Sequence, residues 1–176
     1  MAAQEITQAR APVVLDPGEG EALRFNNDVL TLKATGADTD GAFLLVEELT
    51  RRGKATPLHT HPEEAESFCV LEGEARLHLA GRELTLRPGG FVSVPAGVPH
   101  AYLVTSEVAR LLVLITPGSG AMEAFFRDAG EPAPDRALPP EGPLDIARIG
   151  AAAERTGAVR ILGPPPFGAP AGGHGA

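Results

Sequence analysis

Between residues 42 and 117, apolar residues come in short runs that are separated by glycine, proline and polar residues. The segment Glu74–Leu79 alternates polar and apolar positions with a period of two, as expected for a β-strand with one solvated face. Gly81 and Arg82 divide it from a second such run, which predicts a tight hairpin. Many short strands with glycine and proline turns predict an all-β sandwich or barrel.

The chain divides into four parts by this pattern. Residues 1–41 are mixed, with short apolar pieces at Pro12–Leu15 and Val29–Leu32 that predict edge strands or an arm packed on the barrel. Residues 42–117 form the predicted barrel core. Its expected strands are Ala42–Leu49, Thr56–His61, Ser67–Leu71, Ala75–Ala80, Glu83–Arg87, Phe91–Val94, Ala101–Thr105 and Ala109–Thr116.

A short helical extension is expected after Pro117, over residues 118–163. Met122, Phe125, Phe126 and Ala129 recur with helical spacing and form one apolar stripe. A second helix is expected over residues 145–156, with Asp145 as N-cap and Gly157 as stop signal, followed by a strand at Val159–Leu162. Residues 164–176 contain little besides proline, glycine and alanine, which predicts a disordered tail.

Composition narrows the functional classes. The net charge is -8 and lysine occurs only twice, so the chain lacks the clustered basic residues that nucleic-acid binding needs. Cys69 is the single cysteine, which excludes an intrachain disulfide. No secretory signal and no apolar run of membrane-spanning length stands out, so we expect a cytoplasmic protein with no membrane partner.

The candidate chemistry lies in four residues. His59 and His61 are two positions apart, which on a strand places both side chains on one face about 7 Å apart. Glu66 follows a turn and can return to the same place, and His100 comes from a separate strand. Imidazole and carboxylate suit iron, manganese, nickel, cobalt, copper and zinc. We therefore expect a divalent transition metal of unspecified identity at this group.

Two spaced motifs surround these residues. Residues 53–73 read G-x5-H-x-H-x4-E-x6-G, and residues 89–100 read G-x5-P-x-G-x2-H. They resemble the two signature motifs of the cupin superfamily. The second motif usually ends with asparagine four residues after the histidine, where this chain has Val104. The asparagine is not a ligand in the family pattern, so its absence concerns local turn packing.

The resemblance implies a cupin jelly-roll barrel with His59, His61, Glu66 and His100 as metal ligands at its interior. The single-domain layout with a helical extension is similar to bacterial cupins grouped with quercetin 2,3-dioxygenases. It implies a dioxygenase that acts on a small aromatic or enolisable substrate, with Glu66 also as candidate catalytic base. Cupins commonly pair through sheet edges, so the resemblance implies a homodimer. Alternatives are a non-oxidative isomerase, cyclase or decarboxylase, a small-molecule-binding cupin without turnover, and a metal-free cupin.

Phe68 and Tyr102 have the strand parity of Glu66 and His100 and are candidate substrate-pocket residues, with plain core packing as the alternative. Cys69 has the opposite parity and is expected to point away from the interior as a small hydrophobic residue. Glu63 and Glu64 are expected to be turn charges, with assistance to the site by one of them as the alternative. His78 and His174 are expected to lie outside the site, on the polar face of a strand and in the tail.

Overall fold

The computed structural model describes residues 11–168. Its elements are, in chain order, β1 (Glu21–Phe25), β2 (Asp28–Ala34), β3 (Leu44–Arg51), β4 (Leu58–Thr60), β5 (Ala65–Glu72), β6 (Ala75–Leu79), β7 (Arg82–Leu86), β8 (Phe91–Val94), β9 (His100–Val104), β10 (Val108–Thr116), α1 (Ala121–Ala129), β11 (Glu131–Pro132), α2 (Ile146–Thr156) and β12 (Arg160–Gly163). Within residues 11–168, no helix has the length and hydropathy that crossing a bilayer requires.

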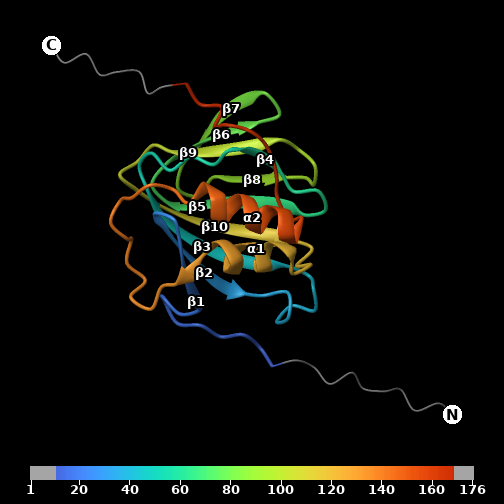
Figure 1. Cartoon of the computed structure of the whole chain (residues 1–176). Helices are drawn as coiled ribbons and strands as arrows, with labels where there is room; N and C mark the ends of the chain where they lie inside the picture. Colours follow the sequence, from blue (N-terminus) through green and yellow to red (C-terminus); the bar gives the residue numbers. More distant parts are fainter. Residues whose placement is uncertain (1–10, 169–176) are drawn as a thin grey trace.

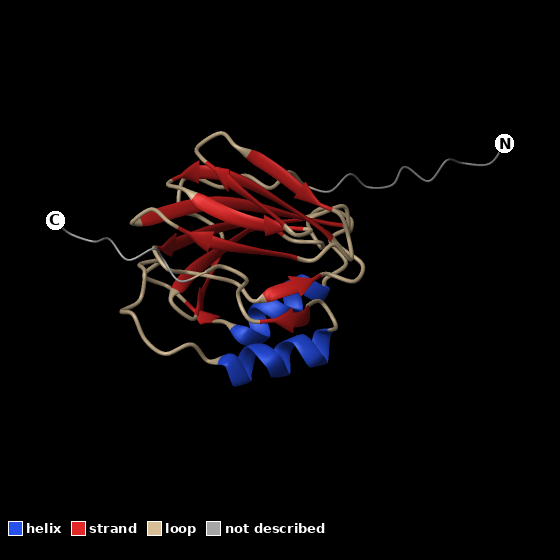
Figure 2. Cartoon of the chain, turned by 90° about the horizontal axis from the view of Figure 1, so that it is seen from above, coloured by secondary structure: helices blue, strands red, loops and turns tan. Residues whose placement is uncertain are grey.

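The strands form two antiparallel sheets that enclose one core (Figure 1). The larger sheet has the order β11-β1-β2-β3-β10-β5-β8, and the smaller has the order β12-β4-β9-β6-β7. Both helices lie together on one side of the strand layers (Figure 2). The expected all-β class with a short helical extension is confirmed.

Alternation along the strands decides which side chains enter the core. In β3, every second residue from Leu44 onward is buried, and the residues between are half-buried. Val113 of β10 pairs with Val46 on one side and with Phe68 of β5 on the other, so these buried side chains form a row across the larger sheet. Burying such rows between two sheets is the main source of stability in a fold of this kind.

All eight strands expected between residues 42 and 117 are present; β8 has the predicted bounds, and the other seven have shifted ends. The hairpin after β6 is displaced by one residue from its predicted place. Ala80 and Gly81 form the turn, with positive φ angles of 48° and 81°, and Arg82 already pairs with Leu79. Two residues with positive φ match the twist of adjacent strands, as in a type I′ turn.

The N-terminal region differs more from expectation. Val29–Leu32 lies in β2, as predicted, but Pro12–Leu15 forms no strand. The sequence did not indicate β1 or β11, because β1 has few large apolar residues and β11 is defined by its two-residue pairing with β1. In the larger sheet β11 pairs with β1, and β1 pairs with β2, so both are defined by their neighbours and not by an apolar pattern of their own.

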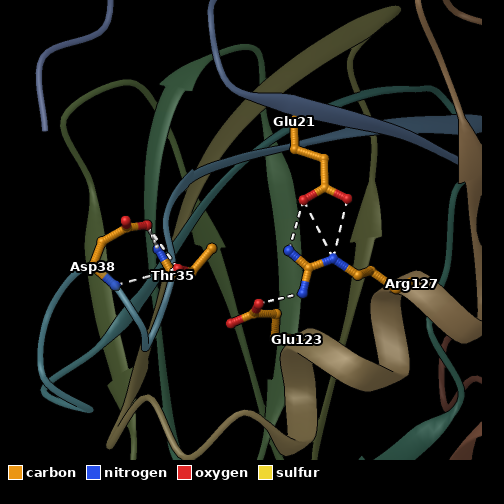
Figure 3. Close-up of polar contacts among 5 residues, drawn as sticks. All are labelled: Glu21, Thr35, Asp38, Glu123 and Arg127. Atoms are coloured by element: carbon orange, nitrogen blue, oxygen red, sulfur yellow. Dashed lines mark hydrogen bonds and ion pairs between the residues drawn. The ribbon is translucent and has the colours of Figure 1, made fainter.

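Helix α1 packs its predicted apolar stripe against β1. The rings of Phe125 and Phe126 lie 5.8 and 5.9 Å from that of Phe25. At the edge of this contact, the guanidinium of Arg127 donates to Glu21 at 2.7 Å and also to Glu123 (Figure 3). The hydrogen bond from Arg127 lowers the pKa of Glu21, but these groups are well exposed and add little stability.

The same view shows how the loop after β2 is closed (Figure 3). The hydroxyl of Thr35 donates to the carboxylate of Asp38 at 2.6 Å, and the Thr35 backbone N–H donates to the same oxygen at 2.8 Å. This side chain-to-backbone arrangement is typical of a tight turn.

Helix α2 follows the predicted start and stop signals. The carboxylate of Asp145 accepts from the N–H of Arg148, and Gly157 ends the helix with φ 67°. Ala152 and Ala153 are buried, and the chain continues into β12 at the place expected for the last strand. Residues 169–176 of the predicted tail lie outside the described residues.

Two motif glycines allow a test of this fold. Gly53 and Gly73 both have positive φ, of 87° and 79°. A Cβ at Gly53 would meet open space, whereas one at Gly73 would overlap the Val108 carbonyl oxygen and approach the Ala109 Cα to 2.9 Å. We predict that Gly53→Ala costs about 1 kcal/mol of unfolding free energy and Gly73→Ala about 3 kcal/mol. Urea unfolding measures both, and equal losses would contradict the packing described here.

Candidate metal centre

The four predicted residues are brought together in the barrel interior. His59 lies on β4 opposite His100 on β9, His61 directly follows β4, and Glu66 lies on β5. One side-chain ligand atom from each lies within 4.8 Å of the others, and all four residues are buried. The two sheets therefore supply ligands from opposite sides of one interior site.

The backbone fixes the orientation of the three imidazoles. The Nδ1 atoms of His59 and His100 lie 2.8 and 2.9 Å from the carbonyl oxygen two residues earlier in the chain. Nδ1 of His61 lies 3.0 Å from the carbonyl oxygen of Ala158. A carbonyl can only accept, so each Nδ1 carries the proton. Each Nε2 is then left for the centre of the site, an arrangement typical of metal-binding histidines.

The spacing of the donors fits a single divalent ion. Oε2 of Glu66 lies 3.1 Å from Nε2 of His61 and 2.9 Å from Nε2 of His100. Two ligands that bind one ion at right angles, with bonds of about 2.1 Å, lie about 3 Å apart. The Glu66 oxygen and the nitrogens of His61 and His100 match that geometry, and the ligand atom of His59 lies within 4.8 Å of them.

Electrostatics favours the ligand forms of His59 and Glu66, but it favours the protonated form of His61. Burial lowers the pKa of His59 to about 4, so its ring is neutral at neutral pH. Burial also acts to lower the pKa of His61, but the Glu66 carboxylate outweighs it and raises that pKa. Burial opposes ionisation of Glu66, yet His61 and His100 together lower its pKa well below the usual range. A metal ion therefore competes with a proton on His61, and Glu66 is already ionised.

A second polar cluster in the interior was not predicted from the sequence. The Tyr102 hydroxyl donates to Glu48 at 2.6 Å, and the Lys54 ammonium pairs closely with Asp28 and lies 3.8 Å from Glu48. Thr50 donates to Asp28 at 2.5 Å. The available signal was the period of two in β3, which places Glu48 and Thr50 on the buried face.

Burial raises the pKa of Glu48 to about 7, and the ionised Asp28 adds to this rise, although Lys54 and the Tyr102 hydroxyl oppose it. Lys54 keeps a raised pKa despite its burial, because Asp28 and Glu48 surround it. Glu48 therefore changes its protonation state near neutral pH.

The predicted pocket residues lie beside the metal group. The Phe68 ring lies 6.3 Å from that of His100 and 5.7 Å from that of Tyr102, and both Phe68 and Tyr102 are buried. Their contact with a substrate stays a prediction. Cys69 is half-buried and pairs with Leu112, on the alternate positions of β5 that face away from the core.

Four polar residues were not expected among the metal ligands: Glu63, Glu64, His78 and His174. Glu64, predicted as a turn charge, is instead buried with 2% of its surface exposed and accepts a hydrogen bond from Ser119. Glu63 is exposed, as expected. His78 on β6 does not belong to the metal-ligand group found among residues 11–168. His174 lies outside the described residues.

Comparison with known proteins agrees with this geometry. Residues 45–115 match the family model described as Cupin domain. This part of the chain is a cupin domain. A solved structure from Thermotoga maritima, described as a predicted oxalate decarboxylase, aligns with a TM-score of 0.53 and 22% identity, over 58% of this chain and 96% of that one. The two sheets are thus a cupin jelly roll.

Two curated proteins also resemble this cupin. "Quercetin 2,3-dioxygenase" from Bacillus subtilis (strain 168) is 33% identical over 128 residues, which cover 73% of this chain and 37% of the relative. An uncharacterized protein from Aquifex aeolicus (strain VF5) is 37% identical over 59 residues, which cover 34% of this chain and 49% of the relative. The matched region is thus less than half of the length of either relative.

The metal assignment is tested by removing one ligand. We predict that His61→Ala sharply lowers the metal that copurifies with the protein, because one of four donors is lost and Glu66 loses a neighbour. Elemental analysis measures this. His78→Ala is the matched control, since it removes a histidine outside the ligand group. Equal metal content in His61→Ala and the parent would reject the site.

The Glu48 carboxyl is tested through the pH dependence of stability. Its pKa is about 7 in the folded protein against an ordinary value of 4.5, so the folded state binds the extra proton between these values. Stability from this group therefore falls as the pH rises. We predict that Glu48→Gln gains about 2 kcal/mol relative to the parent between about pH 5 and about pH 8. Urea unfolding of both proteins with excess chelator measures this difference, and a pH-independent difference would contradict it.

Proposed function

We propose that this cupin is a metal-dependent dioxygenase that acts on a small aromatic or enolisable substrate. The observation that carries the proposal is the convergence of His59, His61, Glu66 and His100, with the ring orientations fixed by backbone carbonyls. The 33% identity to "Quercetin 2,3-dioxygenase" over 128 residues supports the choice of reaction class. Iron, manganese, nickel, cobalt, copper and zinc all suit this donor set.

His59, His61, Glu66 and His100 would hold a divalent ion, which would supply positive charge to polarise a chelating enolate or hydroxy-ketone and, with a redox-active metal, a site for dioxygen chemistry. Neutral imidazoles and one carboxylate leave that charge only partly compensated. The protein's task is to hold the donors in place and to keep bulk water away. The burial of all four residues serves both purposes.

Glu66 has a second task in this proposal. Its Oε2 lies between His61 and His100, which leaves Oε1 to accept the proton of a substrate hydroxyl as the enolate forms. Phe68 and Tyr102 would pack against an aromatic substrate from the next positions along β5 and β9. The two rings are tilted by 59° to each other, so one could stack on such a substrate while the other meets its edge.

Oxygen uptake tests the proposal directly. Protein loaded separately with each of the six metals is mixed with flavonols and related enolic compounds, and dissolved oxygen is followed. We predict uptake with at least one metal and its loss in Glu66→Gln, which keeps the shape of the side chain but removes the proton acceptor and the charge. His78→Ala should retain the parent rate.

The other outcomes separate the alternatives. Turnover of an enolic substrate under strict anaerobiosis would instead indicate an isomerase, cyclase or decarboxylase. Binding of a small molecule without any product would indicate a non-catalytic cupin. No oxygen uptake with any metal would reject the dioxygenase. The homodimer and the cytoplasmic location stay predictions.

A further inference from the structure

One of the three histidines depends on a distant part of the chain. His59 and His100 find their Nδ1 acceptors two residues earlier, in Pro57 and Val98. The acceptor for His61 is the carbonyl of Ala158, which is 97 residues further along the chain. The helical extension therefore contributes a group that touches the metal-ligand set.

The extension also supports the strand that carries His59. Strand β12 pairs with β4 at three positions, and its Ile161 lies opposite His59. Strand β4 pairs with β9 at one position, His59 with His100. Most of the pairing that holds this short ligand strand thus comes from the C-terminal segment rather than from the barrel.

A glycine sets the direction of the Ala158 carbonyl. Gly157 has φ 67° and donates its N–H to the Ala153 carbonyl at 2.9 Å, which turns the chain at the end of α2. Ala158 is then buried with 3% of its surface exposed. Residues other than glycine, asparagine and aspartate rarely adopt this backbone conformation.

We propose that the segment Ile146–Gly163 is an integral part of the metal centre, with Ala158 as the residue that positions His61. The carbonyl of Ala158 holds the Nδ1 proton and thereby directs Nε2 of His61 toward the ion. This inference rests on the metal-binding part of the proposed function, and not on the oxygenase reaction. It assigns the segment Ile146–Gly163 a role in metal retention in addition to the packing of α2 on α1.

The proposal has a reciprocal consequence. If docking of the segment favours metal binding, metal binding favours docking of the segment by the same factor. Partners that orient a metal-bound histidine typically change metal affinity by about 10- to 100-fold. Metal should also slow amide hydrogen exchange in β12, because it stabilises the state in which β12 is paired.

Substitutions at Gly157 test whether the conformation of this segment affects metal affinity. A Cβ at Gly157 would meet no atom within 4 Å, so the effect of a substitution comes from the backbone conformation and not from a clash. We predict that Gly157→Val weakens metal binding by about 10-fold or more, whereas Gly157→Asn stays near the parent, because asparagine tolerates this conformation and valine does not. Chelator competition with Zn²⁺ or Ni²⁺ measures the dissociation constants.

Gly150→Ala is the matched control, since Gly150 lies within α2 and a Cβ there also meets no atom within 4 Å. It should leave the metal affinity unchanged. Thermal unfolding of each metal-free variant separates loss of affinity from global loss of structure. Equal metal affinity in Gly157→Val and Gly157→Asn would overturn the proposal.

Amide hydrogen exchange in the unaltered protein tests the proposal even if Gly157→Val does not fold. Adding Zn²⁺ or Ni²⁺ should slow exchange of the β12 amides much more than exchange in β7, which lies at the opposite edge of the same sheet. Equal slowing in both strands would also overturn the proposal. A parent protein that binds no metal would remove the proposed function as well, whereas bound metal without an effect on β12 would remove this inference alone.

Discussion

The structure depends on keeping four polar side chains that could bind a metal ion, His59, His61, Glu66 and His100, oriented toward one point within an apolar interior. Burial penalises every charge at this place, so His59 is held neutral while Glu66 stays ionised beside two imidazoles. The carbonyls that accept from the histidines satisfy one nitrogen of each ring. The other nitrogen is then left toward the shared centre, and the cross-sheet position of the ligands keeps these donors together. The jelly roll supplies a rigid wall for this arrangement.

The core contains two clusters of polar side chains, the candidate metal ligands and the cluster around Lys54, and an aromatic ring separates them. Phe68 lies between them, with its ring near His100 on one side and near Tyr102 on the other. Beyond it, Asp28, Glu48 and Lys54 form a buried charge cluster in which the pKa of Glu48 is raised to about 7. The negative charge of Glu66 contributes to the raised pKa values of Glu48 and Tyr102, so the two groups influence each other through the barrel.

Local sequence patterns predicted the features that depend on residues close together in the chain, namely the strands and the spacing of the site residues. Short apolar runs between glycine, proline and polar residues located the strands from β3 to β10, and the spaced glycines, histidines and Glu66 located the site. The sequence did not indicate contacts that depend on distant partners. Nothing around Ala158 shows that its carbonyl meets His61, and nothing around Glu64 shows that Ser119 covers it. Strands β1 and β11 were missed for the same reason, because each exists through pairing with a neighbour.

Strand β12 has one further consequence, for the behaviour of the protein in concentrated solution. By occupying the side of β4 away from β9, it removes an unpaired row of N–H and C=O groups from the ligand strand. The new edge is short, has a register shift between Ile161 and Gly163, and continues into Pro164, Pro165 and Pro166, which have no N–H to offer. Such an edge is a poor template for a strand from another molecule. The same residues that complete the sheet beside the histidines thus also protect it against edge-to-edge aggregation.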